Sequence, residues 1–131
     1  LFFIIMVSIT TIAHVCEPGI GKSRSNTGII LNDDIPKAAF NGLKHGDKIY
    51  VVLYHHHHGK FDLWSYGHSV ALSTEQPGIF ANLVFPRPNN LEVVETKVEK
   101  VEDNILWVLR IDVMPGTPVI DVQPINRSVH Y

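Results

Sequence analysis

The sequence has few cysteines, little excess charge and no long apolar run. Cys16 is its single cysteine among 131 residues, which excludes an intrachain disulfide framework and a multi-cysteine zinc site. The net charge of -2 gives no global basic bias for binding nucleic acid through bulk electrostatics. The apolar stretch at residues 1–15 is shorter than the ~20 residues of a transmembrane helix. A hydrophobic content of 45% and a charged content of 18% predict one globular domain stabilised by packing.

Several catalytic motifs are also missing. Gly19 and Gly21 lack the further glycine and the lysine of a phosphate-binding loop. No Gly-x-Ser-x-Gly elbow is present, and Cys16 directly follows the apolar start of the chain, so no nucleophile for hydrolysis is apparent. The adjacent carboxylates Asp33 and Asp34 fall in a polar, turn-like context typical of solvated residues. Nucleotide hydrolysis and serine or cysteine hydrolase chemistry are therefore disfavoured.

Residues 1–17 are interpreted as an apolar leader, either a signal peptide or an anchor. Thr11 and Ala13 are small enough to precede a cleavage site, which would leave His14 as the first mature residue. The alternative is that this stretch is a buried strand of the domain. A signal peptide predicts export or membrane anchoring, whereas a strand predicts a cytoplasmic protein. On the leader interpretation a single domain occupies residues 18–131 and begins with an entry segment at 18–26 that is rich in turn-forming residues.

The remainder of the chain predicts a mostly β protein. β-Branched and aromatic residues favour a central strand at 48–54, and Asn32 to Asp34 can cap a helical turn at 36–40. A long hairpin is expected from 91–102 and 105–113 with its turn at Asp103 and Asn104. Further short strands are expected at 28–31, 61–66, 69–72, 79–81 and 119–122.

The two strands of the predicted hairpin differ in how regularly apolar and polar residues alternate. In the outgoing strand, Glu95 and Lys97 alternate with Val94, Thr96 and Val98, which predicts an exposed outer face. In the return strand one face holds Ile105, Trp107, Leu109, Ile111 and Val113, and the other holds Leu106, Val108, Arg110 and Asp112. One of these two faces is expected to be core.

Asp121 stands inside an apolar strand bounded by Pro118 and Pro124. Gly116, Thr117 and Pro118 predict a tight turn that leads into this strand. Burying a carboxylate in an apolar run is costly, so Asp121 either faces water at an edge strand or accepts specific hydrogen bonds. It is therefore a candidate site residue.

Four consecutive histidines, His55 to His58, follow the central strand. Adjacent residues of a strand point to opposite faces, so at most alternate histidines can converge on one site. Two imidazoles together with His68 or Asp62 would suit zinc. The alternatives are a strand end that runs into a loop, or one pocket histidine beside exposed neighbours.

Two blocks of the sequence form a specific pattern. The first block runs from Gly78-Ile-Phe-Ala81 to Pro86-Arg-Pro-Asn89, and the second is Gly116-Thr-Pro-Val-Ile-Asp121 followed by Pro124. Together they resemble the TsaA-like family, whose best-known members are the tRNA N6-methyltransferases called TrmO. The stretch Val51-Val-Leu-Tyr54 with His57 is similar to the family's Val-Leu-Tyr-Trp-Phe-His strand. The resemblance covers residues 19–125.

This resemblance implies a small antiparallel β-barrel, paired as a homodimer, that binds S-adenosylmethionine near the dimer interface. Family members methylate the N6 nitrogen of threonylcarbamoyl-adenosine in tRNA. The implied cofactor-binding residues are His57, the first block's Arg87, Pro88 and Asn89, and the second block's Gly116, Thr117, Pro118 and Asp121. The implied role of Arg87 is a bidentate contact with a ligand carboxylate.

The chain departs from the family pattern at several polar positions. Leu83 and Gln123 replace an arginine and a lysine, which weakens contacts with an anionic tRNA or with the cofactor's carboxylate. Glu92 replaces a glycine, and Ile125 replaces a tyrosine. The alternative function is a non-catalytic, exported β-barrel that binds another small ligand, or a metal through His55 to His58.

Overall fold

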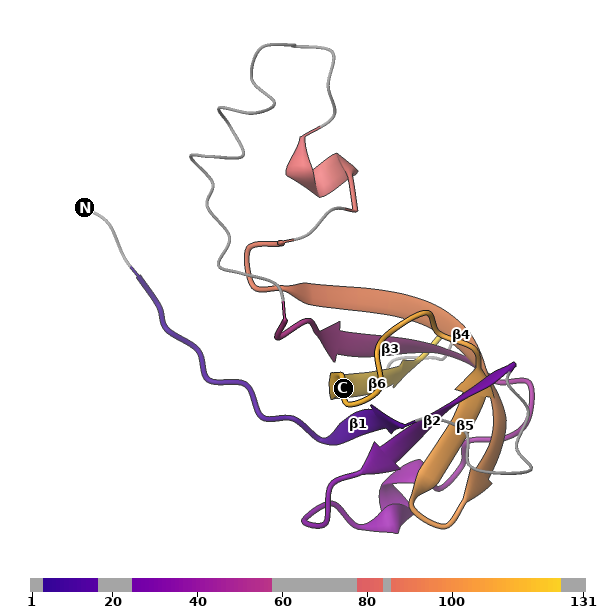
Figure 1. Cartoon of the computed structure of the whole chain (residues 1–131). Coiled ribbons are helices and arrows are strands. Elements are labelled where there is room, and N and C mark those ends of the chain that lie inside the picture. The colour runs from indigo at the N-terminus through magenta and orange to yellow at the C-terminus, as the bar shows by residue number, and fades with distance from the viewer. Residues whose placement is uncertain (1–3, 17–24, 58–77, 84–85, 126–131) are drawn as a thin grey trace.

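The computed structural model describes residues 4–16, 25–57, 78–83 and 86–125. The strands of this part close into an antiparallel barrel in the order β1-β2-β5-β4-β3-β6 (Figure 1). The strands are β1 Ala13–Cys16, β2 Asn26–Leu31, β3 Lys48–Tyr54, β4 Leu91–Glu102, β5 Ile105–Leu109 and β6 Pro118–Pro124. The predicted mostly β fold, a small antiparallel barrel with a long hairpin, is confirmed. The strands expected at 61–66 and 69–72 lie outside the described residues.

Strand β3 has the predicted bounds and lies between β4 and β6 in the barrel wall. It pairs along its length with both β4 and β6. Ile49, Val51 and Leu53 are each 0% exposed, so this alternate set faces the core, while Tyr50 and Val52 point outward. The β-branched and aromatic composition of β3 suits a strand that is paired on both edges.

The boundary expected between residues 17 and 18 does not coincide with the edge of the barrel. Strand β1 precedes that boundary and pairs with β2 through four residues and with β6 at Ala13 and His14. Ala13 and Val15 are buried in the core. Residues 13–16 thus form part of the barrel, as the buried-strand alternative expected, and the leader interpretation of residues 1–17 stays a prediction. The sequence signal was ambiguous because a short apolar run suits both structures.

The hairpin of β4 and β5 turns at Asp103 and Asn104 as predicted, but its return strand ends at Leu109 instead of Val113. Of the two faces described for that strand, the one carrying Leu106 and Val108 forms the core, and both residues are 0% exposed. The pairing of β4 with β5 shifts register between Val98 and Lys100, which is typical of a β-bulge. Beyond Leu109 the backbone of Ile111 bonds to the Thr27 hydroxyl, so the chain leaves the ladder there.

Two short 3-10 helices complete the described part. η1 Lys37–Phe40 buries Phe40 and matches the expected helical turn. η2 Ile79–Ala81 lies where a strand was expected, so that prediction is wrong. The Ala81 amide donates to the Gly78 carbonyl at 3.0 Å, which closes a tight turn in place of a strand. Among the described residues no helix has the length and apolar character needed to cross a membrane.

Candidate functional site

The outer face of β6, β3 and β4 carries the residues that the sequence singled out. Opposite residues of an antiparallel pair share one face. Val52 points outward and lies opposite Asp121 of β6 and Val93 of β4. Asp121 therefore also faces outward, in the wall of a closed barrel and not on an edge strand as one alternative had it.

A groove of about 620 Å³ opens at one end of this outer face. It is bounded by the segment before β1, the end of β3, the turn before β4 and the centre of β6. Its lining residues are Ile9, Thr11, Tyr54, Pro88, Asn89, Asn90 and Ile120. The lining combines apolar side chains with hydroxyl and amide groups, which is the usual character of a small-molecule site.

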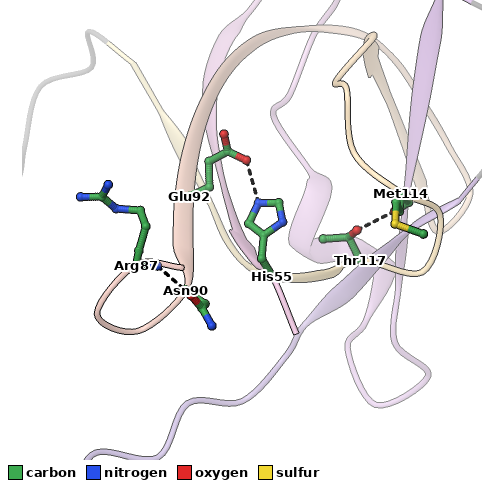
Figure 2. A network of polar contacts seen from close by, with 6 residues as sticks. All are labelled: His55, Arg87, Asn90, Glu92, Met114 and Thr117. Carbon is green, nitrogen blue, oxygen red and sulfur yellow. Dashed lines mark hydrogen bonds and ion pairs between the residues drawn. The ribbon is translucent and has the colours of Figure 1, made fainter. Parts of the chain in front are cut away.

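The turn Arg87 to Asn90 forms one wall of the groove and is fixed by its own hydrogen bonds. The Arg87 amide donates to Asn90 Oδ1 at 2.8 Å, and the Asn90 amide donates to the Arg87 carbonyl at 3.1 Å (Figure 2). Asn90 has a φ of 52°, in the left-handed region that asparagine tolerates better than most residues. Pro88 presets one backbone angle of the turn, so Pro88 and Asn89 are presented to the groove on a rigid support.

Arg87 has a different partner from the one that the resemblance implied. Its guanidinium donates to the Asn82 carbonyl at 2.8 Å and to the Ile79 carbonyl at 3.2 Å. In this structure Arg87 therefore ties the turn to η2, and its contact with a ligand carboxylate stays a prediction.

Asp121 borders a second groove, of about 420 Å³, between η1 and β6. Its carboxylate accepts hydrogen bonds from the Val122 amide at 2.9 Å and from Gln123 Nε2 at 2.7 Å. Gln123 stands where the family pattern has lysine, so an amide replaces an ammonium beside this carboxylate. Asp121 adjoins Ile120 in β6, which lines the larger groove.

The turn at residues 116–118 supports the barrel. Gly116 has a φ of 85°, a conformation that favours glycine. Its amide donates to the Val15 carbonyl at 2.7 Å, and the Val15 amide donates to the Thr117 carbonyl at 2.9 Å. Thr117 is buried, and its hydroxyl donates to the Met114 carbonyl (Figure 2). Gly116, Thr117 and Pro118 thus join β1 to β6, and their predicted contact with a cofactor stays untested.

His55 makes the contact that the sequence interpretation missed. His57, the predicted site residue, is exposed, and its ring lies against that of His56 with centroids 3.8 Å apart. His55 is half-buried, and its Nε2 lies 2.7 Å from Glu92 Oε1 (Figure 2). The sequence signal was a polar residue at the end of each of two strands, but the register of β3 with β4 was needed to bring the two together.

The described residues contain no group of three or more histidine, cysteine, aspartate or glutamate side chains able to hold a metal. His58, Asp62 and His68 lie outside them. Burial raises the pKa of the Cys16 thiol, which keeps it protonated at neutral pH and disfavours nucleophilic chemistry. A hydrogen bond with Asp103 raises the pKa of Lys37 and lowers that of Asp103, on an exposed turn.

These features define a class of protein: a small closed antiparallel β-barrel with an open groove on its outer face, walled by a proline-containing turn. Residues 10–130 match the family model of the tRNA-methyltransferase O N-terminal domain. The chain belongs to this family, which confirms the resemblance seen in the sequence.

Individual relatives agree with this assignment. The mouse tRNA (adenine(37)-N6)-methyltransferase is 26% identical over 103 residues, which cover 72% of this chain and 24% of that protein. A Pyrococcus abyssi relative, named "Probable S-adenosyl-L-methionine-binding protein", is 30% identical over 77 residues, covering 56% of this chain and 39% of that protein. The crystal structure of TrmO from Pseudomonas aeruginosa has a TM-score of 0.68 and 21% identity, covering 95% of this chain and 56% of that chain. The chain thus spans only part of each relative's length.

Proposed function

We propose that this domain binds S-adenosylmethionine in the larger groove and serves a methyltransferase that acts on N6 of threonylcarbamoyl-adenosine in tRNA. The observation that carries the proposal is the position of Pro88 and Asn89, from the family's Arg-Pro-Asn block, in the wall of that groove. Family membership and the names of the relatives support the choice of ligand.

The groove residues fit this ligand in size and chemistry. A volume of about 620 Å³ lies within the range of ~300–1,000 Å³ usual for small-molecule sites. Ile9 and Ile120 offer apolar surface to an adenine ring, and Asn89 and Thr11 offer hydrogen-bonding groups to its polar edge. The Tyr54 ring suits the cationic sulfonium group.

When bound, S-adenosylmethionine would supply an electrophilic methyl group. The task of this chain is to bind and orient it, because methyl transfer depends mainly on the alignment of nucleophile, methyl and leaving group. The rigid turn at Arg87 to Asn90 suits that task, since its conformation is held by hydrogen bonds within the turn and to η2.

The proposal includes a homodimer. Val93 on the outer face is 58% exposed, and Ile4, Ile5, Met6 and Val7 are 77–91% exposed. Figure 1 shows residues 4–10 running away from the barrel. Exposed apolar surface of this kind is typical of protein interfaces. Asp121 and Asn89 border different grooves of one chain, and a second copy against this face offers a way for both to contact one ligand.

Calorimetric titration of S-adenosylmethionine into the 131-residue chain tests the proposal. We expect binding at micromolar strength, about -8 kcal/mol. Asn89→Ala should weaken binding, whereas Asn41→Ala, which alters the smaller groove, should not. The absence of binding heat, or an effect of Asn41→Ala alone, contradicts the proposed site.

Substrate choice needs a separate measurement. We expect transfer of labelled methyl groups to tRNA that carries threonylcarbamoyl-adenosine and none to the same tRNA without this modification. Binding without transfer to either tRNA would leave a cofactor-binding domain and would contradict the proposed methyltransferase activity of this chain alone.

A further inference from the structure

The contact between His55 and Glu92 lies where the long connection of residues 55–90 leaves β3 and enters β4. Leu53 and Glu92 are opposite each other in the β3–β4 register and therefore share a face. Leu53 is fully buried, so Glu92 points toward the barrel interior at its end. The side chains of His55 and Glu92 are only 16% and 19% exposed.

Because the pair is buried, it is expected to contribute little net stability. Removing two polar groups from water costs free energy that their attraction only partly offsets, and apolar replacements are often as stable. The best-attested role of such pairs is to fix one register or conformation. The short distance, 2.7 Å between His55 Nε2 and Glu92 Oε1, defines a specific geometry suited to that role.

The same histidine is bonded to the groove wall through its backbone. The His55 amide donates to the Asn90 carbonyl at 2.8 Å, and Asn90 Oδ1 accepts from the Arg87 amide. His55 therefore contacts the start of β4 through its side chain and the turn through its main chain. Asn90 and Tyr54, the residue before His55, both line the larger groove.

We infer that the His55–Glu92 pair is a positioning element that fixes the turn Arg87 to Asn90 against the end of β3 and so sets the affinity of the groove for its ligand. The ligand part of this inference rests on the proposed function. Glu92 stands where the family pattern has glycine, so the pair is a feature of this chain's own sequence.

Amide hydrogen exchange tests the positioning role without any ligand. In Glu92→Ala we expect exchange at the His55 and Arg87 amides to accelerate about tenfold, the size expected for loss of a hydrogen bond with a charged group. The amide of Val108, in the core strand β5, should be unchanged. Glu92→Gln keeps an acceptor oxygen and should restore most of the protection. Unchanged exchange, or equal acceleration at Val108, overturns the inference.

Titration of S-adenosylmethionine then tests the link to the groove. Glu92→Ala and His55→Ala should each weaken binding about tenfold, and the double variant should bind no more weakly than either. Asp103→Ala is the matched control, because it breaks a contact of equal length, 2.7 Å to Lys37, on an exposed turn.

If exchange accelerates but the unaltered chain binds no S-adenosylmethionine, the proposed function fails and the positioning role stands. If the unaltered chain binds and Glu92→Ala binds equally well, the link to affinity is wrong.

Discussion

Asp121 shows how one residue can serve the barrel and the groove at once. Its carboxylate accepts hydrogen bonds from Val122 and Gln123. It faces outward, borders the smaller groove and directly follows Ile120, which lines the larger groove. Asp121→Asn keeps the shape and removes the negative charge. We expect the affinity for S-adenosylmethionine to fall about fivefold, because a cation near the site loses roughly 1 kcal/mol of attraction.

The control for Asp121→Asn is Asp103→Asn, which removes a carboxylate at an exposed turn. Calorimetric titration and thermal unfolding should be measured for both variants. A loss of melting temperature in Asp121→Asn that parallels the loss of affinity would assign Asp121 a structural role and contradict the binding role.

Gly28 is required by a close contact between three strands. A Cβ atom placed there would lie 2.5 Å from Cys16 Sγ and 3.1 Å from a carbon of the Trp107 ring. Gly28→Ala should therefore lower the free energy of unfolding by about 1–3 kcal/mol, as overpacking of a core does. Urea denaturation measures the change.

Two variants make the Gly28 prediction specific. Cys16→Ala combined with Gly28→Ala removes the nearest clashing atom and should recover most of the loss. Gly78→Ala meets no atom within 4 Å and should leave stability nearly unchanged. Equal stability of Gly28→Ala and the unaltered chain would contradict a stability role for this close contact.

At the residue scale, one of the two blocks of family-like sequence lies at the larger groove. Pro88 and Asn89 line it, because a short turn that contains proline is encoded locally, and their contact with a cofactor stays a prediction. The contacts of Arg87 with the Ile79 and Asn82 carbonyls were not predictable, because they depend on a chain segment folding back as η2. The choice of His55 over His57 depended on strand register, which four identical neighbours cannot specify.

At the element scale, the hairpin shows the limit of alternation as a signal. β5 carries apolar residues on both faces, so the period identifies two faces without telling which is core. The same substitution on each face distinguishes them. Leu106→Ala should cost about 2–5 kcal/mol of unfolding free energy, and Leu109→Ala less than about 1 kcal/mol, because Leu109 is 44% exposed. Comparable losses in urea denaturation would contradict the observed core face.

β1 is the element whose role the sequence left open. Its partners are β2 and β6, and β6 begins about a hundred residues later in the chain, so no local pattern specifies the pairing. A chain that starts at Pro18 lacks β1 and should fail to fold, because β2 and β6 lose a shared neighbour and the core loses Ala13 and Val15. A chain that starts at Ile9 keeps β1 and the groove wall and should unfold cooperatively near the original temperature. Circular dichroism during heating compares the two, and cooperative unfolding of the shorter chain would contradict a structural role for β1.

At the scale of the whole molecule, the barrel has an asymmetric surface. The outer face of β6, β3 and β4 carries Val52, Tyr54 and Val93 toward one end and Lys48, Glu95 and Lys97 toward the other. The proposed homodimer would place the apolar end of this face against the same face of a second copy across a two-fold axis.

Val93→Glu tests the proposed dimer. The substitution places two like charges at or near the two-fold axis, and we expect it to convert dimers to monomers with little change in melting temperature, because Val93 is outward-facing in one chain. Light scattering after size-exclusion chromatography measures the mass. Leu109→Glu is the control, since it adds the same charge at an exposed apolar position on β5.

If the dimer also completes the binding site, Val93→Glu should weaken S-adenosylmethionine binding in proportion to the monomer formed. Monomeric mass for the unaltered chain would contradict the dimer, and full affinity in monomeric Val93→Glu would place the entire site within one chain.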